Sequence, residues 1–261
     1  MARGPLLQDA YAVNKAVARM GTDEELLDDI LIGRSNADMN AIQQKYRQIY
    51  GKDMVKEVLD DLSGDTKTMY QYILAGQRAE ESAPCIPHEI EQKVDRLQDA
   101  TKGRSIGTNE EVVCQILAYA SDGQIRAMAH RYNDKYKTTL DAVIKSQTSI
   151  QKHMQHALLL MIARAVDRVK SDADDLAASM KGAGTKNDLL INGKLLRASK
   201  ESSADTRFLG LVRIHWNREH LRQVKVAFTR FHHKKGLAAR IEDDISRGHY
   251  RDIMVALAGQ G

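Results

Sequence analysis

Two closely spaced glycines stand in the stretch Met180-Lys181-Gly182-Ala183-Gly184-Thr185, which is followed by Lys186-Asn187-Asp188-Leu189-Leu190. Because glycine tolerates positive φ, such a pair lets the backbone turn sharply and point several carbonyl oxygens in one direction. Hard cations such as Ca²⁺ take roughly six to eight carbonyl and carboxylate oxygens. Thr185 is expected to cap a following helix, with Asp188 three residues later. The stretch therefore predicts a loop with exposed oxygens before a helix, although an ordinary glycine-rich turn between helices would contain the same residues.

The same pattern occurs twice more in the chain. Gly21-Thr22-Asp23-Glu24-Glu25 and Gly107-Thr108-Asn109-Glu110-Glu111 each precede an apolar run. In both copies a threonine is followed three residues later by a glutamate, which is the capping-box signature of a helix start. Gly21 and Gly107 are 86 residues apart, and Gly107 and Gly184 are 77 residues apart. Three copies at similar spacing indicate an array of repeats.

The composition is typical of a globular helical protein. Of 261 residues, 43% are hydrophobic and 28% are charged, and only 3 are prolines. The net charge of +4 is compatible with an acidic membrane surface or nucleic acid and diagnostic of neither. The sequence has no apolar run of about 18 residues and no signal-peptide core, so we expect a cytoplasmic protein whose membrane role is peripheral. The two cysteines, Cys85 and Cys114, match no metal or redox spacing and are expected to be free thiols.

Apolar residues recur at helical spacing through most of the chain. Five short helices are expected between Leu7 and Ile73, with Asn36 as the expected cap of the third, and the same order returns after a proline-containing linker. The predicted boundaries are a repeat at 1–75, a linker at 76–92, a repeat at 93–166, and a repeat at 167–261 with an insertion near 191–207. The predicted fold is all-α, with about five helices in each repeat.

A loop of carbonyls needs a carboxylate to bind a dication at useful affinity. Forty residues after Gly21 stands Asp61, and forty residues after Gly107 stands Gln147. Asp244 stands 60 residues after Gly184, and the 20 additional residues match the predicted insertion. Asp243 is an alternative ligand in this third copy. Because the neutral Gln147 removes the strongest oxygen ligand, the second copy is expected to bind calcium weakly.

These motifs resemble those of the annexin family. The resemblance rests on the loop 180–185 with its distant acid, and on four phrases that are similar to annexin repeat phrases at their usual positions: Gly21-Thr22-Asp23-Glu24-Glu25, Arg34-Ser35-Asn36-Ala37, Tyr50-Gly51-Lys52 and Leu62-Ser63-Gly64-Asp65. It covers nearly the whole chain and implies a curved array of helical repeats. The chain resembles repeats two to four of the usual four, with the first absent, and a fungal-type annexin, a truncated chain, a splice form or a faulty gene model would each fit this pattern.

The resemblance implies calcium-dependent binding to acidic phospholipid, without catalysis and without a nucleic-acid partner. The third copy matches the family's calcium site best: it offers the carbonyls of Met180, Gly182 and Gly184 and the carboxylate of Asp244. In such a site Ca²⁺ would connect the loop and the carboxylate to a lipid phosphate. The alternative is a calcium-independent membrane or protein scaffold whose calcium sites have decayed.

The first copy departs from the family pattern at one position. It keeps Gly21 and Asp61, but Arg19 stands where another glycine is expected. Its backbone carbonyl remains a possible ligand, whereas a side chain resists the turn, and the positive charge lies near the ion or contacts lipid phosphate instead.

Three further expectations concern charge and packing. Asp9 and Arg34 resemble a buried charge pair of the family's central channel, whereas Trp216 stands where the third repeat should have the matching arginine. Without its usual partner repeat, the third repeat should expose an apolar face. The turn His232-His233-Lys234-Lys235 is basic, and it either contacts phosphates or is simply solvated.

Overall fold

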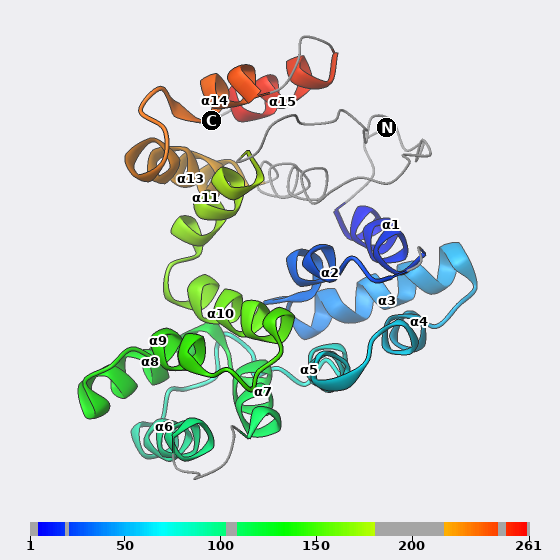
Figure 1. Cartoon of the computed structure of the whole chain (residues 1–261). Helices are drawn as coiled ribbons and strands as arrows, with labels where there is room; N and C mark the ends of the chain where they lie inside the picture. Colours follow the sequence, from blue (N-terminus) through cyan, green and yellow to red (C-terminus); the bar gives the residue numbers. More distant parts are fainter. Residues whose placement is uncertain (1–4, 19–20, 103–108, 181–216, 245–248, 260–261) are drawn as a thin grey trace. The chain divides into compact units, whose positions relative to one another are not determined.

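The structure, a computed structural model, describes residues 5–18, 21–102, 109–180, 217–244 and 249–259 (Figure 1). Within these residues it has fourteen α-helices and no β-strand, so the all-α prediction is confirmed. Contacts within the chain divide it into two compact units, Leu6–Val166 and Asp167–Gly261. No helix in the described part of the chain is long and apolar enough to cross a membrane.

The first repeat of the unit 6–166 consists of five helices. They are α1 (Pro5–Val17), α2 (Glu24–Leu31), α3 (Asn36–Tyr50), α4 (Met54–Asp61) and α5 (Gly64–Leu74). Their apolar residues recur three or four positions apart and therefore lie on one face of each helix. In α3, for example, Met39, Ile42 and Tyr46 are buried. Gly51 ends this helix with a φ of 66°, a conformation that a side chain would strain.

The second repeat has the same order of elements. It consists of α6 (Pro87–Thr101), α7 (Glu110–Tyr119), α8 (Asp122–Tyr136), α9 (Leu140–Ser146) and α10 (Lys152–Val166). The first of these helices begins at Pro87, inside the range 76–92 that was expected to be a linker. Proline suits the first turn of a helix, because the N–H that it lacks would have no partner there.

The caps of α2 and α7 lie one residue later than predicted. At α2 the side chain of Asp23 accepts a hydrogen bond from the backbone N–H of Leu26 at 3.1 Å. At α7 the side chain of Asn109 accepts one from Val112 at 3.3 Å. Aspartate and asparagine cap helices at least as well as threonine. Thr22 was therefore wrongly predicted as the cap, and its hydroxyl is used elsewhere.

Asn36 was also predicted as a cap, and here too the neighbouring residue takes that place. Ser35 caps α3 by accepting a hydrogen bond from Asp38 at 3.1 Å. The Asn36 amide instead donates to the carbonyl oxygen of Arg78 at 2.8 Å, and its oxygen accepts from the Arg78 N–H at 3.0 Å. Because Ser35 caps the helix, the side chain of Asn36 can bind the segment that leads from the first repeat to the second.

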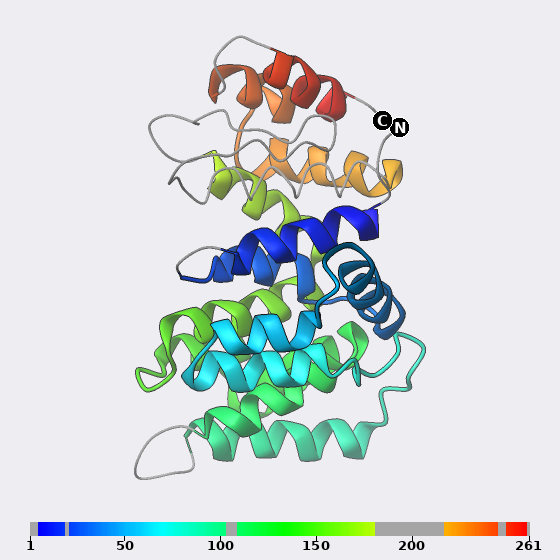
Figure 2. The same ribbon diagram turned by 90° about the vertical axis from the view of Figure 1, so that its right-hand side faces the viewer.

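The two repeats of the unit 6–166 share one helical interface. α5 packs against α7, and α10 packs against both α5 and α2 (Figures 1 and 2). At the edge of this interface the rings of Tyr72 and Tyr119 meet edge to face, with their centroids 5.4 Å apart. Tyr72 also donates its hydroxyl hydrogen to Glu111 at 2.8 Å. Apolar packing and polar contacts therefore join the repeats.

In the unit 167–261, four helices are described. They are α11 (Arg168–Ser179), α13 (Arg218–Phe231), α14 (Gly236–Asp244) and α15 (His249–Gly259). α11 packs against α13, and α14 packs against α13 and α15. Their core includes Leu176, Leu221, Phe228, Ile241 and Met254. The insertion predicted near 191–207, the helix cap Thr185 and the side chain of Trp216 lie outside the described residues.

Candidate functional site

In the first repeat, the loop between α1 and α2 meets the end of α4. The Thr22 hydroxyl donates a hydrogen bond to Asp61 Oδ2 at 2.6 Å and lies 3.0 Å from the carbonyl oxygen of the same residue. Asp61 is the last residue of α4 and is exposed. The carboxylate that stands forty residues after Gly21 in the sequence therefore lies beside the loop.

Gly21 gives this loop its sharp turn. Its φ is 92°, and a Cβ atom added there would meet no other atom within 4 Å. The backbone conformation, not a lack of space, therefore favours glycine at this position. Arg19, the other residue proposed from the sequence for this site, lies outside the described residues.

In the second repeat, an amide takes the place of the carboxylate. The Gln147 side-chain amide donates to the carbonyl oxygen of Val143 at 3.0 Å and to Ser146 Oγ at 3.2 Å. These contacts turn the side chain back onto the end of α9. Its backbone carbonyl oxygen accepts a hydrogen bond from Gln155 at 3.1 Å. Gln147 therefore supports the turn between α9 and α10 and brings no negative charge to it.

In the third repeat, the structure describes only part of the predicted site, namely the end of α11 and the backbone of α14. Met180 caps α11 and is buried, and its carbonyl oxygen accepts a hydrogen bond from the Arg240 guanidinium of α14. Asp244, whose backbone ends α14, follows Arg240 by four residues, or one helical turn. Gly182, Gly184 and the Asp244 side chain lie outside the described residues. The structure thus brings the backbone of Met180 beside the helix that carries Asp244.

The predicted buried charge pair of the first repeat forms. The Arg34 guanidinium contacts Asp9 Oδ2, and the Asp9 side chain is only 2% exposed. Arg34 also donates to the carbonyl oxygen of Ile30 at 2.8 Å. A carboxylate this deeply buried needs a partner charge, because desolvation would otherwise favour its neutral form.

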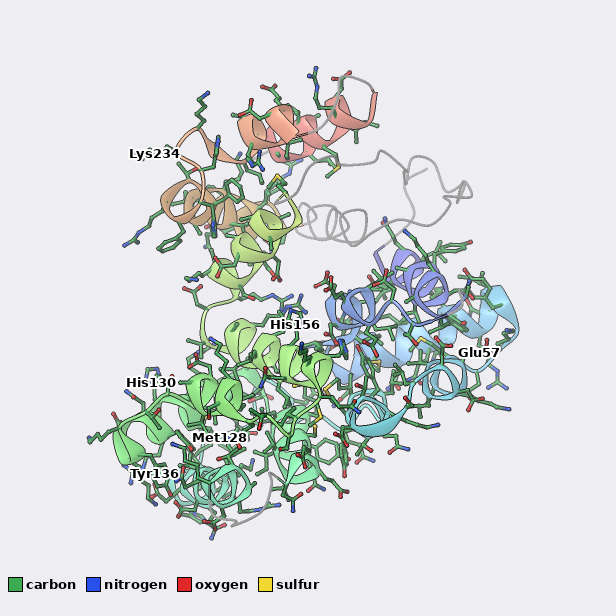
Figure 3. All side chains as sticks on the ribbon, in the orientation of Figure 1. Glu57, Met128, His130, Tyr136, His156 and Lys234 are labelled. Carbon is green, nitrogen blue, oxygen red and sulfur yellow. The ribbon has the colours of Figure 1, made fainter. Side chains whose placement is uncertain are left out.

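A second buried carboxylate, Asp28, was not predicted from the sequence. It lies on α2 at the interface of the two repeats and is completely buried. Tyr70 donates its hydroxyl hydrogen to Asp28 Oδ1 at 2.7 Å. From α10, His156 Nδ1 lies 3.4 Å from Oδ2 and His153 Nε2 lies 3.5 Å from Oδ1. His156 is labelled in Figure 3. Two features of the sequence could have indicated this cluster. They are an acidic residue among apolar residues on one helix and two histidines three positions apart on another.

These contacts shift the pKa values within the cluster. Burial alone would raise the pKa of Asp28, but the adjacent His153 and the hydrogen bonds with His156 and Tyr70 lower it below its usual value. Burial alone would lower the pKa of His153, but the Asp28 carboxylate raises it. Burial and the adjacent Asp28 raise the pKa of Tyr70 well above its usual value. The cluster therefore favours an ionised aspartate facing a protonated histidine.

Arg164 of α10 completes the polar contacts across this interface. Its guanidinium donates to the carbonyl oxygens of Asp28 and Ile32 at 3.3 and 3.2 Å, and it binds Asp29 at 3.1 Å. The side chain is 5% exposed. One arginine thus binds the C-terminal carbonyls of α2, where a positive charge is favoured by the helix dipole.

The described residues contain no cluster of three or more His, Cys, Asp or Glu side chains arranged to hold a metal ion. A calcium site of the predicted kind differs from such a cluster, because most of its ligands are backbone carbonyls with one carboxylate. At the first loop, the oxygens that the structure brings together are the Thr22 hydroxyl and the carboxylate and carbonyl of Asp61.

Comparisons with known proteins agree with the helical repeats. The family model "Annexin" matches residues 8–73 and 92–159. Annexin C1 of Cryptococcus neoformans var. grubii is 32% identical over 262 aligned positions, which cover 98% of this chain and 50% of that protein. The chain therefore spans about half the length of this curated relative.

Solved structures show the same fold. The structure of annexin III superposes with a TM-score of 0.81 at 24% identity, covering 98% of this chain and 72% of that one. The calcium-bound structure of annexin (Sm)1 superposes with a TM-score of 0.76 at 19% identity, covering 98% and 70% of the two chains. The matched ranges 8–73 and 92–159 make up just over half of the chain, and the chain therefore belongs to the annexin family.

Proposed function

We propose that this annexin binds acidic phospholipid membranes reversibly, through Ca²⁺ held in its interhelical loops, at the cytosolic face of the membrane. Calcium-dependent phospholipid binding is a property of the annexin family, and the fold is shared with a calcium-bound annexin. The proposal includes no catalytic step. In it, Ca²⁺ removes the repulsion between a loop carboxylate and a lipid phosphate by binding both.

The contact between Thr22 and Asp61 is the observation that supports this proposal most directly. A cation at the loop would meet the exposed Asp61 carboxylate and the carbonyl oxygens that follow from the turn at Gly21. Arg19 would supply a further carbonyl. Its positive side chain would weaken the binding of a cation or would contact the lipid phosphate directly.

In the third repeat we propose a second site, formed by Met180, Gly182, Gly184 and Asp244. Its support is the contact between the Met180 carbonyl oxygen and Arg240, which precedes Asp244 by one helical turn on α14. The Arg240 guanidinium already occupies the Met180 carbonyl, so calcium would have to displace this internal cation or use the carbonyl's second lone pair. The third site is therefore expected to bind more weakly than its sequence motif indicates.

Sedimentation with acidic vesicles over a calcium titration tests the proposal. Asp61→Asn removes one negative charge from the first site, and Asp244→Asn does so in the third. Each change should raise the calcium concentration needed for half-maximal binding by about tenfold or more, which corresponds to about 1.4 kcal/mol. Asp60→Asn is the matched control for the first site, because Asp60 is exposed on the same helix. Glu242→Gln is the control on α14, because Glu242 is exposed and belongs to neither proposed site.

The competing function is a calcium-independent scaffold. Vesicle binding by the unmodified chain that is equal in calcium and in excess chelator would reject the calcium bridge. An equal effect of Asp60→Asn and Asp61→Asn would reject the first site, since a specific ligand must differ from its exposed neighbour.

A further inference from the structure

A strongly basic stretch runs from α13 into α14. Residues 220–241 contain six lysines and arginines and no aspartate or glutamate, whereas the whole chain contains 35 acidic residues. A basic stretch is often no more than a solvated surface. Whether it forms a binding surface depends on its neighbours, because ion pairs within the protein would cancel its charge.

At the turn between the two helices, cations stand beside exposed apolar side chains. We define the α13–α14 patch as Val226, Arg230, Phe231, Lys234 and Lys235. Val226 and Phe231 are 60% and 49% exposed, the highest values for large hydrophobic residues in the described part of the chain. Val226 precedes Arg230 by one helical turn and lies on the same side of α13. Figure 3 shows Lys234 on the turn, at the outer edge of its unit.

The ring of Phe231 lies close to two cations. Arg230 Cζ is 5.1 Å from the ring centroid, and Lys170 Nζ of α11 is 5.7 Å from it. Both distances fall within the range of a cation–π contact. The aromatic side chain is thus presented to solvent together with positive charge.

The acidic groups near the patch are already bound to other cations. Asp174 binds Lys170 at 2.5 Å and His232 at 2.6 Å. Glu219 binds Arg222 at 2.7 Å, near the opposite end of α13. By contrast, the cations of the patch are Arg230, Lys234 and Lys235. None of them forms an ion pair with a residue that the structure describes. Their charge remains available to an anionic partner.

We propose that the α13–α14 patch binds the surface of an acidic phospholipid bilayer without calcium. Lysines and arginines near such a surface each contribute about 1 kcal/mol, or about a fivefold change in partitioning. Exposed Phe231 and Val226 suit the boundary between headgroups and acyl chains, where amphipathic helices bury their apolar residues. Single-stranded nucleic acid fits less well, because it needs several aromatic side chains for successive bases, and the patch has one.

The α13–α14 patch lies apart from the proposed calcium ligand Met180. Lys170, which contacts Phe231, lies in the first turn of α11, whereas Met180 lies at its end. Ten residues of helix separate them, or about 15 Å. The patch therefore does not include the end of α11, where the Met180 carbonyl oxygen is one of the proposed calcium ligands.

The test uses the full chain, excess chelator and low salt. Binding to mixed phosphatidylserine–phosphatidylcholine vesicles is compared with binding to pure phosphatidylcholine vesicles by sedimentation. Lys234→Ala with Lys235→Ala should weaken binding to the acidic vesicles on the order of 25-fold, and Phe231→Ala should weaken it less. Lys93→Ala with Arg96→Ala on α6 removes the same charge at another surface and should have little effect. Lys93 is half-buried and the other residues changed in this test are exposed. Thermal unfolding checks that each variant folds.

Three outcomes would overturn the proposal. The first is that the unmodified chain fails to sediment with acidic vesicles in chelator. The second is that the α6 control loses as much binding as the patch variant, which would indicate only a dependence on net charge. The third is that single-stranded RNA binds at lower protein concentration than vesicles and displaces them. The increase in binding caused by calcium is measured separately and should persist in the patch variants, so failure of the two proposals can be distinguished.

Discussion

Thr22 and Asp61 are 39 residues apart in the sequence, and the Thr22 hydroxyl donates a hydrogen bond of 2.6 Å to the Asp61 carboxylate. This bond joins the loop before α2 to the last residue of α4. It fixes the orientation of an exposed side chain that would otherwise sample several rotamers. A ligand held in place before the ion arrives loses less conformational entropy on binding.

Replacing Thr22 with valine should therefore weaken calcium binding at the first loop. The change keeps the shape of the side chain and removes the donor to Asp61. Hydrogen bonds to charged groups contribute about 1.5–3 kcal/mol when buried, and an exposed one contributes less. We expect the calcium concentration for half-maximal vesicle binding to rise by about threefold to tenfold, measured by sedimentation. Thr22→Ser keeps the hydroxyl and should behave like the unmodified chain, and a serine variant as weak as the valine variant would contradict the role assigned to the hydrogen bond.

Replacing Arg240 should strengthen calcium binding at the third loop. Its guanidinium binds the Met180 carbonyl oxygen, which is one of the proposed calcium ligands. Arg240→Met removes this competing cation and keeps an aliphatic chain of similar length on α14. The calcium concentration for half-maximal vesicle binding should fall. Arg222→Met on the exposed side of α13 is the control, because it removes the same charge away from the loop. A higher calcium requirement in Arg240→Met would instead show that the arginine holds the loop in its binding conformation.

Local features of the sequence were sufficient to predict most helices. The spacing of Met39, Ile42 and Tyr46 places them on one face of α3 in any environment, and all three are buried. The caps were less predictable, since neighbouring residues such as Thr22 and Asp23 both have a side-chain oxygen. A contact with Asp61, distant in the sequence, leaves the cap to Asp23.

Asp28 shows what the sequence could not reveal. An acid among Leu27, Ile30 and Leu31 is unexpected on an apolar face, but its partners come from α5 and α10. His156 is 128 residues away in the chain. No local pattern predicts which distant side chains will face a buried carboxylate, because their positions depend on the packing of the two repeats.

Tyr70→Phe should measure how strongly this interface depends on the Asp28 carboxylate. The change removes one donor from a carboxylate that is completely buried and leaves the ring in place. We expect a loss of about 1.5–3 kcal/mol in the free energy of unfolding, measured by urea denaturation. Tyr72→Phe is the matched control, because Tyr72 lies on the same helix and donates to the exposed Glu111. If the control lost as much unfolding free energy or more, burial of Asp28 would not increase the contribution of its hydrogen bond to stability.

The pH dependence of stability should also originate in this cluster. The groups that face the Asp28 carboxylate are Tyr70 of α5 and His153 and His156 of α10. Around them, Glu24 contacts His153, and Arg164 binds the Asp28 carbonyl oxygen and Asp29.

The pKa of His153 is raised above its usual 6.5, so its contribution is complete below about pH 6.5 and is lost as the pH rises through the raised value. The pKa of Asp28 is lowered below its usual 3.8, so its contribution is present above about pH 3.8 and is lost as the pH falls through the lowered value. The cluster should therefore stabilise the interface between the two repeats most in mildly acidic solution.

Urea denaturation at about pH 5.5 and at successively higher pH tests this expectation, because the contribution of His153 is lost as the pH rises through its raised pKa. The unmodified chain should lose unfolding free energy at the higher pH. In His153→Gln this loss should be smaller, since a glutamine cannot acquire a proton to face Asp28. His130→Gln on the exposed side of α8 is the control and should keep the full pH dependence (Figure 3). An unfolding free energy that falls equally with rising pH in the unmodified chain and in His153→Gln would contradict the contribution assigned to His153.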